Sequence, residues 1–225
     1  MFQRIGGLAA VIAAATYLIG FWVYFTVLGP ASYGSSQVDP GQHVVFLVEN
    51  QQLMHLWNLV IFIVNAILMV VISIALYHRI KGGSEELAQT ATAFGLIWAG
   101  LILASGMVAN ISLLEIVNLA ARDAEEAATL WRALSTVEAG IGGGNEITGG
   151  MWILLVSWAA QWARAIPSVI NLLGTAIGAA GVLTMVPGLT EAATVFGLGF
   201  ILWFILVGLV LLFGRVRTEA REAGQ

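Results

Sequence analysis

Three polar residues occur at helical spacing within an otherwise apolar stretch of the chain: His55, Asn58 and Asn65. The steps of three and seven residues between them place all three side chains on one face of an α helix. A buried polar group costs free energy unless a partner satisfies it, so such residues are the best pointers to a site. Histidine can carry a proton near neutral pH or ligate a metal, and the amides can donate and accept hydrogen bonds. This face is therefore one side of a candidate ligand, ion or proton site.

A second polar face lies in the next apolar stretch and is formed by Asn110, Glu115, Asn118 and Arg122. Two consecutive membrane helices run in opposite directions, so the start of one and the end of the next lie on the same side. His55 and Glu115 are therefore expected at a common depth, about one turn inside the outer boundary. Glu49 and Glu146 are expected at the mouth of the same side. Together these residues predict one polar pocket in the outer leaflet.

A purely structural interpretation of the same residues stays open. In that interpretation, Asn58 and Asn65 only form hydrogen bonds between helices, at about 0.6 kcal/mol each. Glu115 would then reach water or pair with Arg122, seven residues later on its own helical face. The pattern alone does not decide between a site and structural satisfaction.

Several catalytic and cofactor chemistries can be weighed against the same residues. His55 and Glu115 are weak metal candidates, because zinc accepts nitrogen and oxygen ligands but no His-x-x-x-His or Glu-x-x-His spacing occurs. They could also act as the acid and base of a membrane enzyme if they came within hydrogen-bond reach. Retinal chemistry is excluded because the only lysine, Lys81, lies between spans. With no cysteine, thiolate sites are excluded as well. The cofactor is unknown.

The composition is that of an integral membrane protein. Hydrophobic residues make up 59% of the 225-residue chain and charged residues 10%, whereas a soluble domain carries roughly 25% charge. The apolar run that follows Arg4 is too long for a signal-peptide core of about 7–15 residues, so we expect it to be a first span. At 1.5 Å per residue, each apolar run can cross a hydrocarbon core about 30 Å thick. The sequence predicts a single all-α membrane domain, 1–225, with six spans at about 6–28, 53–77, 91–119, 149–165, 167–187 and 192–213.

Short helices are expected on the outer face. Asp39 and Pro40 are typical of a helix cap followed by proline in the first helical turn, so a short apolar helix (44–48) is expected before the second span. The segment 122–138 has one apolar face, formed by Ala127, Leu130, Trp131, Leu134 and Val137. Its other side is charged, which predicts a helix lying at the membrane interface above the polar pocket. We expect the glycine-rich run 141–146 to be a flexible connector.

The distribution of basic residues predicts the orientation. With the N-terminus inside, the cytoplasmic ends would hold most of the nine basic residues, namely Arg4, Arg79, Lys81, Arg164, Arg215, Arg217 and Arg221. Only Arg122 and Arg132 would lie on the other side. Under the positive-inside rule this bias predicts that both termini are cytoplasmic. No basic patch indicates nucleic acid as a partner.

Three segments carry a resemblance to a known family. They are Arg4-Ile5-Gly6-Gly7-Leu8, the second span entered at Asn50 and closed by Leu76-Tyr77, and the turn Arg164-Ala165-Ile166-Pro167 leading to Gly174 and Gly181. In these features and in its layout the chain resembles an uncharacterised family of small prokaryotic membrane proteins, domain of unknown function 4386. Ser168 stands where the family's turn often has a second basic residue. The resemblance implies a bundle of six membrane helices and carries over no catalytic residue.

The leading functional hypothesis is a non-enzymatic protein of the prokaryotic cytoplasmic membrane. It would bind a small or lipidic ligand in the outer pocket, or act as an accessory subunit against partner helices or a second copy of itself. The opposing hypothesis is a small transporter or channel, although no inverted repeat of two three-helix halves is visible in the sequence. A membrane enzyme that uses Glu115 and His55 is the third.

Overall fold

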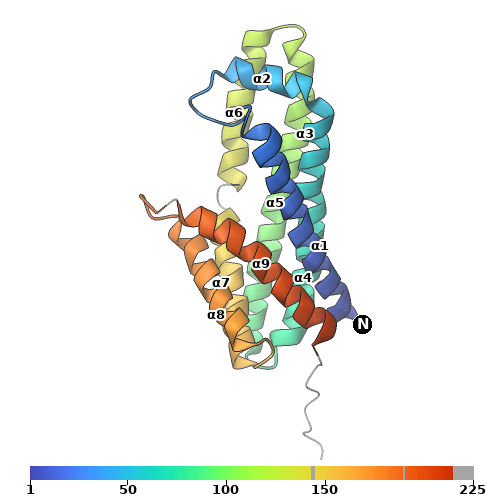
Figure 1. The fold of residues 1–225 in the computed structure, drawn as a ribbon, viewed down its shortest axis with the longest axis vertical. Helices are drawn as coiled ribbons and strands as arrows, with labels where there is room; N and C mark the ends of the chain where they lie inside the picture. Colours follow the sequence, from blue (N-terminus) through green and yellow to red (C-terminus); the bar gives the residue numbers. More distant parts are fainter. Residues whose placement is uncertain (143–144, 190, 215–225) are drawn as a thin grey trace, which may run out of the picture.

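The computed structural model describes residues 1–142, 145–189 and 191–214, and within these ranges it contains helices and no strand (Figure 1). The all-α fold class is thereby confirmed. The helices are α1 (Phe2–Val23), α2 (Pro40–Glu49), α3 (Gln51–Asn58), α4 (Asn65–Ile80), α5 (Glu85–Ala120), α6 (Ala124–Gly142), α7 (Asn145–Trp162), α8 (Ser168–Leu183) and α9 (Ala192–Phe213). Two π-helical turns, η1 (Tyr24–Leu28) and η2 (Leu59–Val64), extend α1 and join α3 to α4. The chain therefore forms continuous helices over Phe2–Leu28 and Gln51–Ile80.

Six of these helices form a closed ring in chain order. In the ring α1, α4, α5, α7, α8 and α9 each contact the next, and α9 returns to contact α1. Glycines allow the backbones of neighbouring helices to approach most closely. Such close packing of small residues holds helices together in a membrane, where the hydrophobic effect does not drive them to associate. A Cβ on Gly7 would lie 2.8 Å from the Gly208 carbonyl oxygen, and one on Gly150 would lie 2.7 Å from that of Gly178. Glycine therefore sets the spacing of α1 against α9 and of α7 against α8.

Aromatic side chains fill the inside of the ring. Trp98, Trp152 and Trp203 come from three different helices and are 2% exposed or less. The ring centroids are 5.6 Å apart for Trp98 and Trp152, and 5.5 Å apart for Trp152 and Trp203. Phe200 and Phe204 of α9 pack against this column. The column makes the middle of the ring a packed core.

Four helical segments are long and apolar enough to cross a membrane within the described ranges. They are Phe2–Leu28, Gln51–Ile80, Glu85–Ala120 and Ala192–Phe213. The sequence predicts six spans, but α7 and α8, which correspond to the expected spans 149–165 and 167–187, are not among these four. The reason for α8 is its length, because it has 16 residues. The expected basic tail after Phe213 lies outside the described residues.

A second layer covers one end of the ring. α5 has 36 residues, about 54 Å at 1.5 Å per residue, so it extends well beyond a hydrocarbon core of about 30 Å. Its far end, with α2, α3 and α6, surrounds a separate small core that includes Leu47, Met54, Leu113 and Ala127. Figure 1 shows this outer layer at the top, away from the N-terminus. We call it the outer layer below.

The placement of α6 differs from the sequence-based expectation. The amphipathic pattern of 122–138 predicts a helix lying flat at the interface, whereas α6 runs back beside α5 and packs against α5 and α2 (Figure 1). The reason is that the protein itself covers the apolar face: Ala127 is fully buried, and Leu130, Trp131 and Leu134 pack on the outer core. Val137 is the exception, at 50% exposed.

Local capping explains where the outer helices begin. The Asp39 carboxylate accepts a hydrogen bond from the Gly41 amide at 2.8 Å, and Pro40 occupies the first helical turn of α2, as the sequence predicts. At the start of α6, the Asp123 carboxylate accepts hydrogen bonds from the Glu125 and Glu126 amides, at 3.0 and 2.9 Å. Each aspartate satisfies amide groups that a helix leaves unpaired at its first turn.

Candidate ligand-binding site

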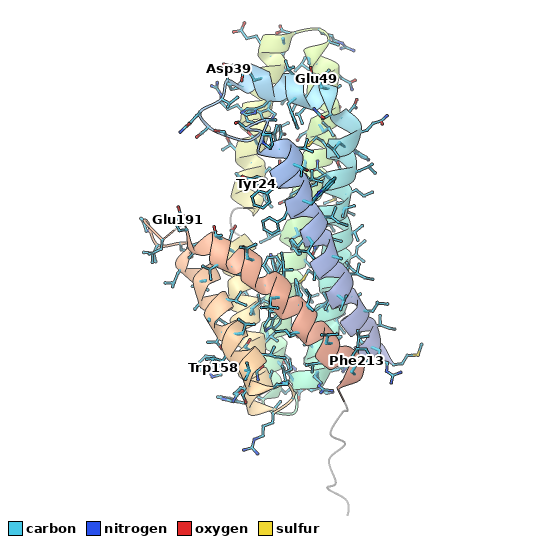
Figure 2. All side chains as sticks on the ribbon, in the orientation of Figure 1. Tyr24, Asp39, Glu49, Trp158, Glu191 and Phe213 are labelled. Atoms are coloured by element: carbon cyan, nitrogen blue, oxygen red, sulfur yellow. The ribbon has the colours of Figure 1, made fainter. Side chains whose placement is uncertain are left out.

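The residues of the predicted polar pocket are distributed over different environments. His55, Glu115, Asn118, Arg122 and Glu49 are all exposed. None of them lines the three cavities described below. Figure 2 places Glu49 on α2 in the outer layer, far from Phe213 at the opposite end. Within the described residues, no group of three His, Asp or Glu side chains is close enough to hold a metal ion.

The asparagines of the predicted pocket are placed differently from one another. Asn65 is fully buried, and its side-chain amide donates a hydrogen bond to the Thr16 hydroxyl at 2.8 Å, which joins α4 to α1. Asn110 is half-buried, and its side-chain oxygen has no hydrogen-bond partner among the described residues. Asn58 is buried and lines a cavity of about 60 Å³ together with Ser112 and Glu138. Of the three, Asn58 is the one that faces a cavity.

Three cavities meet at Trp57, which lines all of them. The first, the inner cavity, has a volume of about 290 Å³. Its wall is largely aromatic and is formed by Tyr17, Phe21, Tyr24, Trp57, Phe62, Trp98, Phe196 and Phe200, with Gly20, Ile61, Ile102, Glu146, Ala193 and Gly197. Figure 2 shows Tyr24 between the ring and the outer layer. The inner cavity is an apolar space with one carboxyl group at its edge.

The outer cavity is larger, at about 890 Å³, and many of its lining side chains are polar. It shares Trp57 and Phe62 with the inner cavity, so the same two side chains form part of both walls. The polar side chains of its wall are Tyr33, Ser35, Ser36, Ser105, Arg132, Ser135, Thr136 and Glu138. The Ser105 hydroxyl is buried and has no hydrogen-bond partner among the described residues. Two adjoining cavities therefore differ in the types of side chain that line them, while most of the surface of each is apolar.

The π-helical turn η2 positions the shared wall. It lies between Asn58 and Asn65 and contains Phe62, and such turns inside α helices are frequent at functional sites. The α5 backbone approaches it closely, because a Cβ on Gly106 would lie 2.5 Å from the Phe62 Cβ atom. On the other side, the Trp57 indole donates a hydrogen bond to the Gly20 carbonyl oxygen at 3.4 Å. Trp57 and Phe62 are thus held between α1 and α5.

A cluster of aromatic rings positions one side of the outer cavity. His43 is 1% exposed and stacks on Trp131, with ring centroids 4.2 Å apart. A ring nitrogen of His43 lies 3.2 Å from the Ser35 carbonyl oxygen, which ties the loop before α2 to α2 itself. The Trp131 indole donates to the Tyr33 hydroxyl at 3.5 Å. These contacts place Tyr33 and Trp131 in the cavity wall.

The electrostatics of the outer cavity centre on Glu138. Burial raises the pKa of the Glu138 carboxyl group to about 6. Burial also raises the pKa of Tyr33 to about 12, opposed by its hydrogen bond with Trp131 and reinforced by the nearby Glu138. The Glu138 carboxyl group is therefore less solvated than an ordinary surface carboxyl group.

Sequence reasoning missed Glu138, Trp131 and Ser135 as site residues. The sequence does contain a pattern that indicates these residues. Steps of four and three residues separate Trp131, Ser135 and Glu138, so the three share one helical face. Glu138 therefore lies on the apolar side of α6, where an acid is unusual. The charged residues on the opposite side of the helix dominate the sequence pattern and conceal this signal.

The depth of Trp57 is set by the helix that carries it. Trp57 precedes Arg79 by 22 residues on one continuous helix, a rise of about 33 Å. Arg79 is the basic end of that helix: its guanidinium donates to the Ala165 carbonyl oxygen at 3.1 Å and to the Gln3 side chain at 3.2 Å. A hydrocarbon core of about 30 Å separates two interfaces by nearly the same distance. Trp57 and Arg79 are therefore far enough apart to lie at opposite interfaces of a bilayer.

The comparisons with known proteins identify a family and no function. A family model described as a domain of unknown function (DUF4386) matches residues 5–214. No curated protein and no solved structure matches the chain.

Proposed function

The chain belongs to the DUF4386 family, domain of unknown function, and we propose from its cavities that it is a membrane protein that binds an amphipathic, lipid-like ligand. The apolar part of the ligand occupies the inner cavity, and its polar head occupies the outer cavity. The four long apolar helices establish that the chain is suited to a bilayer. The ligand is therefore drawn from the lipid phase around the protein.

One observation carries this proposal: a cavity with an aromatic wall and a cavity whose wall includes charged and hydroxyl side chains adjoin at Trp57 and Phe62, near the expected membrane interface. Lipids also change from apolar to polar at that depth, and Trp is the residue enriched there. Binding cavities for small ligands have volumes of about 300–1,000 Å³ with few polar groups. The two cavities together match the order of apolar and polar groups in an amphipathic ligand, and the inner cavity has room for part of its apolar chain.

We further propose that all six ring helices lie in the membrane, with both ends of the ring's chain on the cytoplasmic side. The support is that α7 and α8 occupy ring positions between α5 and α9, which are apolar spans. Phe213 lies at the same end of the molecule as the N-terminus (Figures 1 and 2). Arg79, Lys81 and Arg164 lie in or beside the turns at that end, in agreement with the positive-inside rule.

The other hypotheses have less support. A transporter or channel needs a continuous polar path, and the column of Trp98, Trp152 and Trp203 fills the ring where such a path would run. An enzyme using His55 and Glu115 needs the two side chains within hydrogen-bond reach, and both are exposed outside the cavities. An accessory subunit needs a face that binds a partner. The exposed apolar residues of α8 could form such a face, but contact with lipid explains their exposure equally well.

Filling the inner cavity tests the proposal. Gly197 lines it, and a Cβ at that position would meet one atom of Phe21 at 3.8 Å, an ordinary contact. Gly197→Leu is therefore expected to occupy the cavity without a clash at its Cβ. Native mass spectrometry of the full chain in mild detergent should show retained phospholipid for the wild type and much less for Gly197→Leu.

Gly100→Leu is the matched control, because Gly100 is an exposed helical glycine with no atom within 4 Å of an added Cβ. It should retain as much lipid as the wild type. Equal lipid retention by Gly197→Leu and Gly100→Leu would show that the inner cavity is not the binding site.

A further inference from the structure

The outer cavity holds one acid and one cation that do not neutralise each other. Glu138 and Arg132 both line it. They are six residues apart on α6, a rise of about 9 Å. No ion pair joins their side chains to each other or to any other group in the described part of the chain. The cavity wall therefore offers two separate, opposite charges to a ligand.

The neighbouring side chains suit each charge differently. Tyr33, Trp57 and Trp131 line the same cavity as Glu138, and aromatic rings beside a carboxylate are how proteins bind organic ammonium groups. The Ser135 and Thr136 hydroxyls, about one helical turn from Arg132, donate to its backbone carbonyl oxygen at 3.1 and 2.8 Å, so the guanidinium is the donor that remains for a ligand. A guanidinium is suited to the oxygens of a phosphate. The two charges thus have the surroundings of two different ligand groups.

A third polar group lies in the wall of the outer cavity. The buried Ser105 hydroxyl lines the outer cavity beside the shared wall residues Trp57 and Phe62 and has no hydrogen-bond partner among the described residues. A buried hydroxyl without a hydrogen-bond partner needs an explanation, and one explanation is that a ligand atom accepts its hydrogen bond. In the outer cavity, an ester carbonyl oxygen of a lipid would accept its hydrogen bond.

We propose that the outer cavity binds a zwitterionic phospholipid head group, with its ammonium beside Glu138 and its phosphate beside Arg132. This inference rests on the proposed function, because it names the class of the amphipathic ligand. An anionic lipid without an amine would leave the Glu138 charge without a partner. A simple organic cation would leave Arg132 without one. A head group that carries both charges satisfies both residues.

The test compares two lipids that differ in the amine. The full-length protein in mild detergent is exposed to an equimolar mixture of phosphatidylethanolamine and phosphatidylglycerol with matched acyl chains, and retained lipid is counted by native mass spectrometry. The wild type should retain phosphatidylethanolamine roughly tenfold over phosphatidylglycerol, as expected for one charge-assisted hydrogen bond. Glu138→Gln should lose this preference, because its retention of phosphatidylethanolamine falls to about that of phosphatidylglycerol. Arg132→Gln should lower the retention of both lipids.

Matched controls separate charge in the cavity from charge elsewhere. Glu126→Gln and Arg122→Gln remove exposed charges that line none of the three cavities, so both variants should keep the wild-type preference. A further arm offers phosphoethanolamine, the same head group without acyl chains. Poor competition by this soluble compound identifies the ligand as a lipid, whereas strong competition would overturn the assignment to a lipid head group.

The outcomes for the two proposals are distinguishable. If the wild type retains both lipids equally, or Glu138→Gln keeps the preference, the head-group assignment is wrong and lipid binding still stands. If the wild type retains no lipid, or no more than Gly197→Leu does, the proposed function itself fails.

Discussion

Replacing Glu138 by glutamine should make the protein more stable at neutral pH. The folded protein raises the pKa of this carboxyl group from 4.5 to about 6. The folded state therefore binds the proton more tightly than the unfolded state. The free energy of unfolding accordingly falls as the pH rises from about 4.5 to about 6, and stays lower above that window. Glutamine has nearly the same shape and no charge, so it removes this cost.

The size of the effect follows from the pKa. Raising it from 4.5 to about 6 corresponds to on the order of 2 kcal/mol at pH 7.5. For a chain of this length, 1 kcal/mol moves the melting temperature by about 2–4 °C, so Glu138→Gln should melt roughly 4–8 °C higher. At pH 4.5 the wild-type carboxyl group is almost fully protonated in the folded state and about half protonated in the unfolded state, so most of the difference disappears and the two proteins should melt at nearly the same temperature.

The assay is thermal unfolding followed by circular dichroism, in one detergent, at pH 4.5, 6 and 7.5. Glu126→Gln is the control, because Glu126 is exposed and should show no comparable pH-dependent gain. A Glu138→Gln protein that melts below the wild type at pH 7.5, or gains equally at all three pH values, would refute the reasoning. It would mean that the carboxylate is stabilised by a partner in the folded protein.

Two further predictions concern the ring and its orientation. Gly150→Ala should destabilise the protein by on the order of 1–3 kcal/mol, because the new Cβ would lie 2.7 Å from the Gly178 carbonyl oxygen. Thermal unfolding should show no such loss of stability for the control Gly100→Ala. Equal melting temperatures for the two variants would contradict the close approach of α7 to α8. Because the chain has no cysteine, a single Gln37→Cys should react with a membrane-impermeant maleimide on intact cells. Gly82→Cys should react only after permeabilisation, and the reverse pattern would invert the proposed orientation.

The helical content and several boundaries followed from the sequence because they depend on local chemistry. The Asp39 cap and the proline after it define the start of α2 through hydrogen bonds within a few residues. The apolar run beginning at Ala192 ends at Phe213, as the helix α9 does. The resemblance to the domain of unknown function 4386 family is confirmed over residues 5–214.

The site could not be predicted in the same way, because helical spacing tells which residues share a face and not what that face touches. His55 and Asn58 illustrate this: they are three residues apart, yet His55 is exposed and Asn58 is buried against a cavity. The π-helical turn that follows Asn58 shifts the register of the helix, and no residue pattern indicates it. Whether Glu138 faces lipid, water or protein depends on how α6 packs against α5 and α2. A turn separates α5 from α6, and α2 is distant from α6 in the sequence, so local spacing does not indicate this packing.

The contact of α9 with α1 has a consequence for how the protein is made. Gly7 and Gly208 meet across this seam, so α1 pairs with the ring helix that is synthesised after the other five. Until α9 is synthesised, Tyr17 on α1 lacks its partner ring Phe200, 4.5 Å away in the finished fold. Phe196 and Phe200 of α9 also supply part of the inner cavity's wall, so that wall is complete only once α9 has been synthesised and has packed against α1.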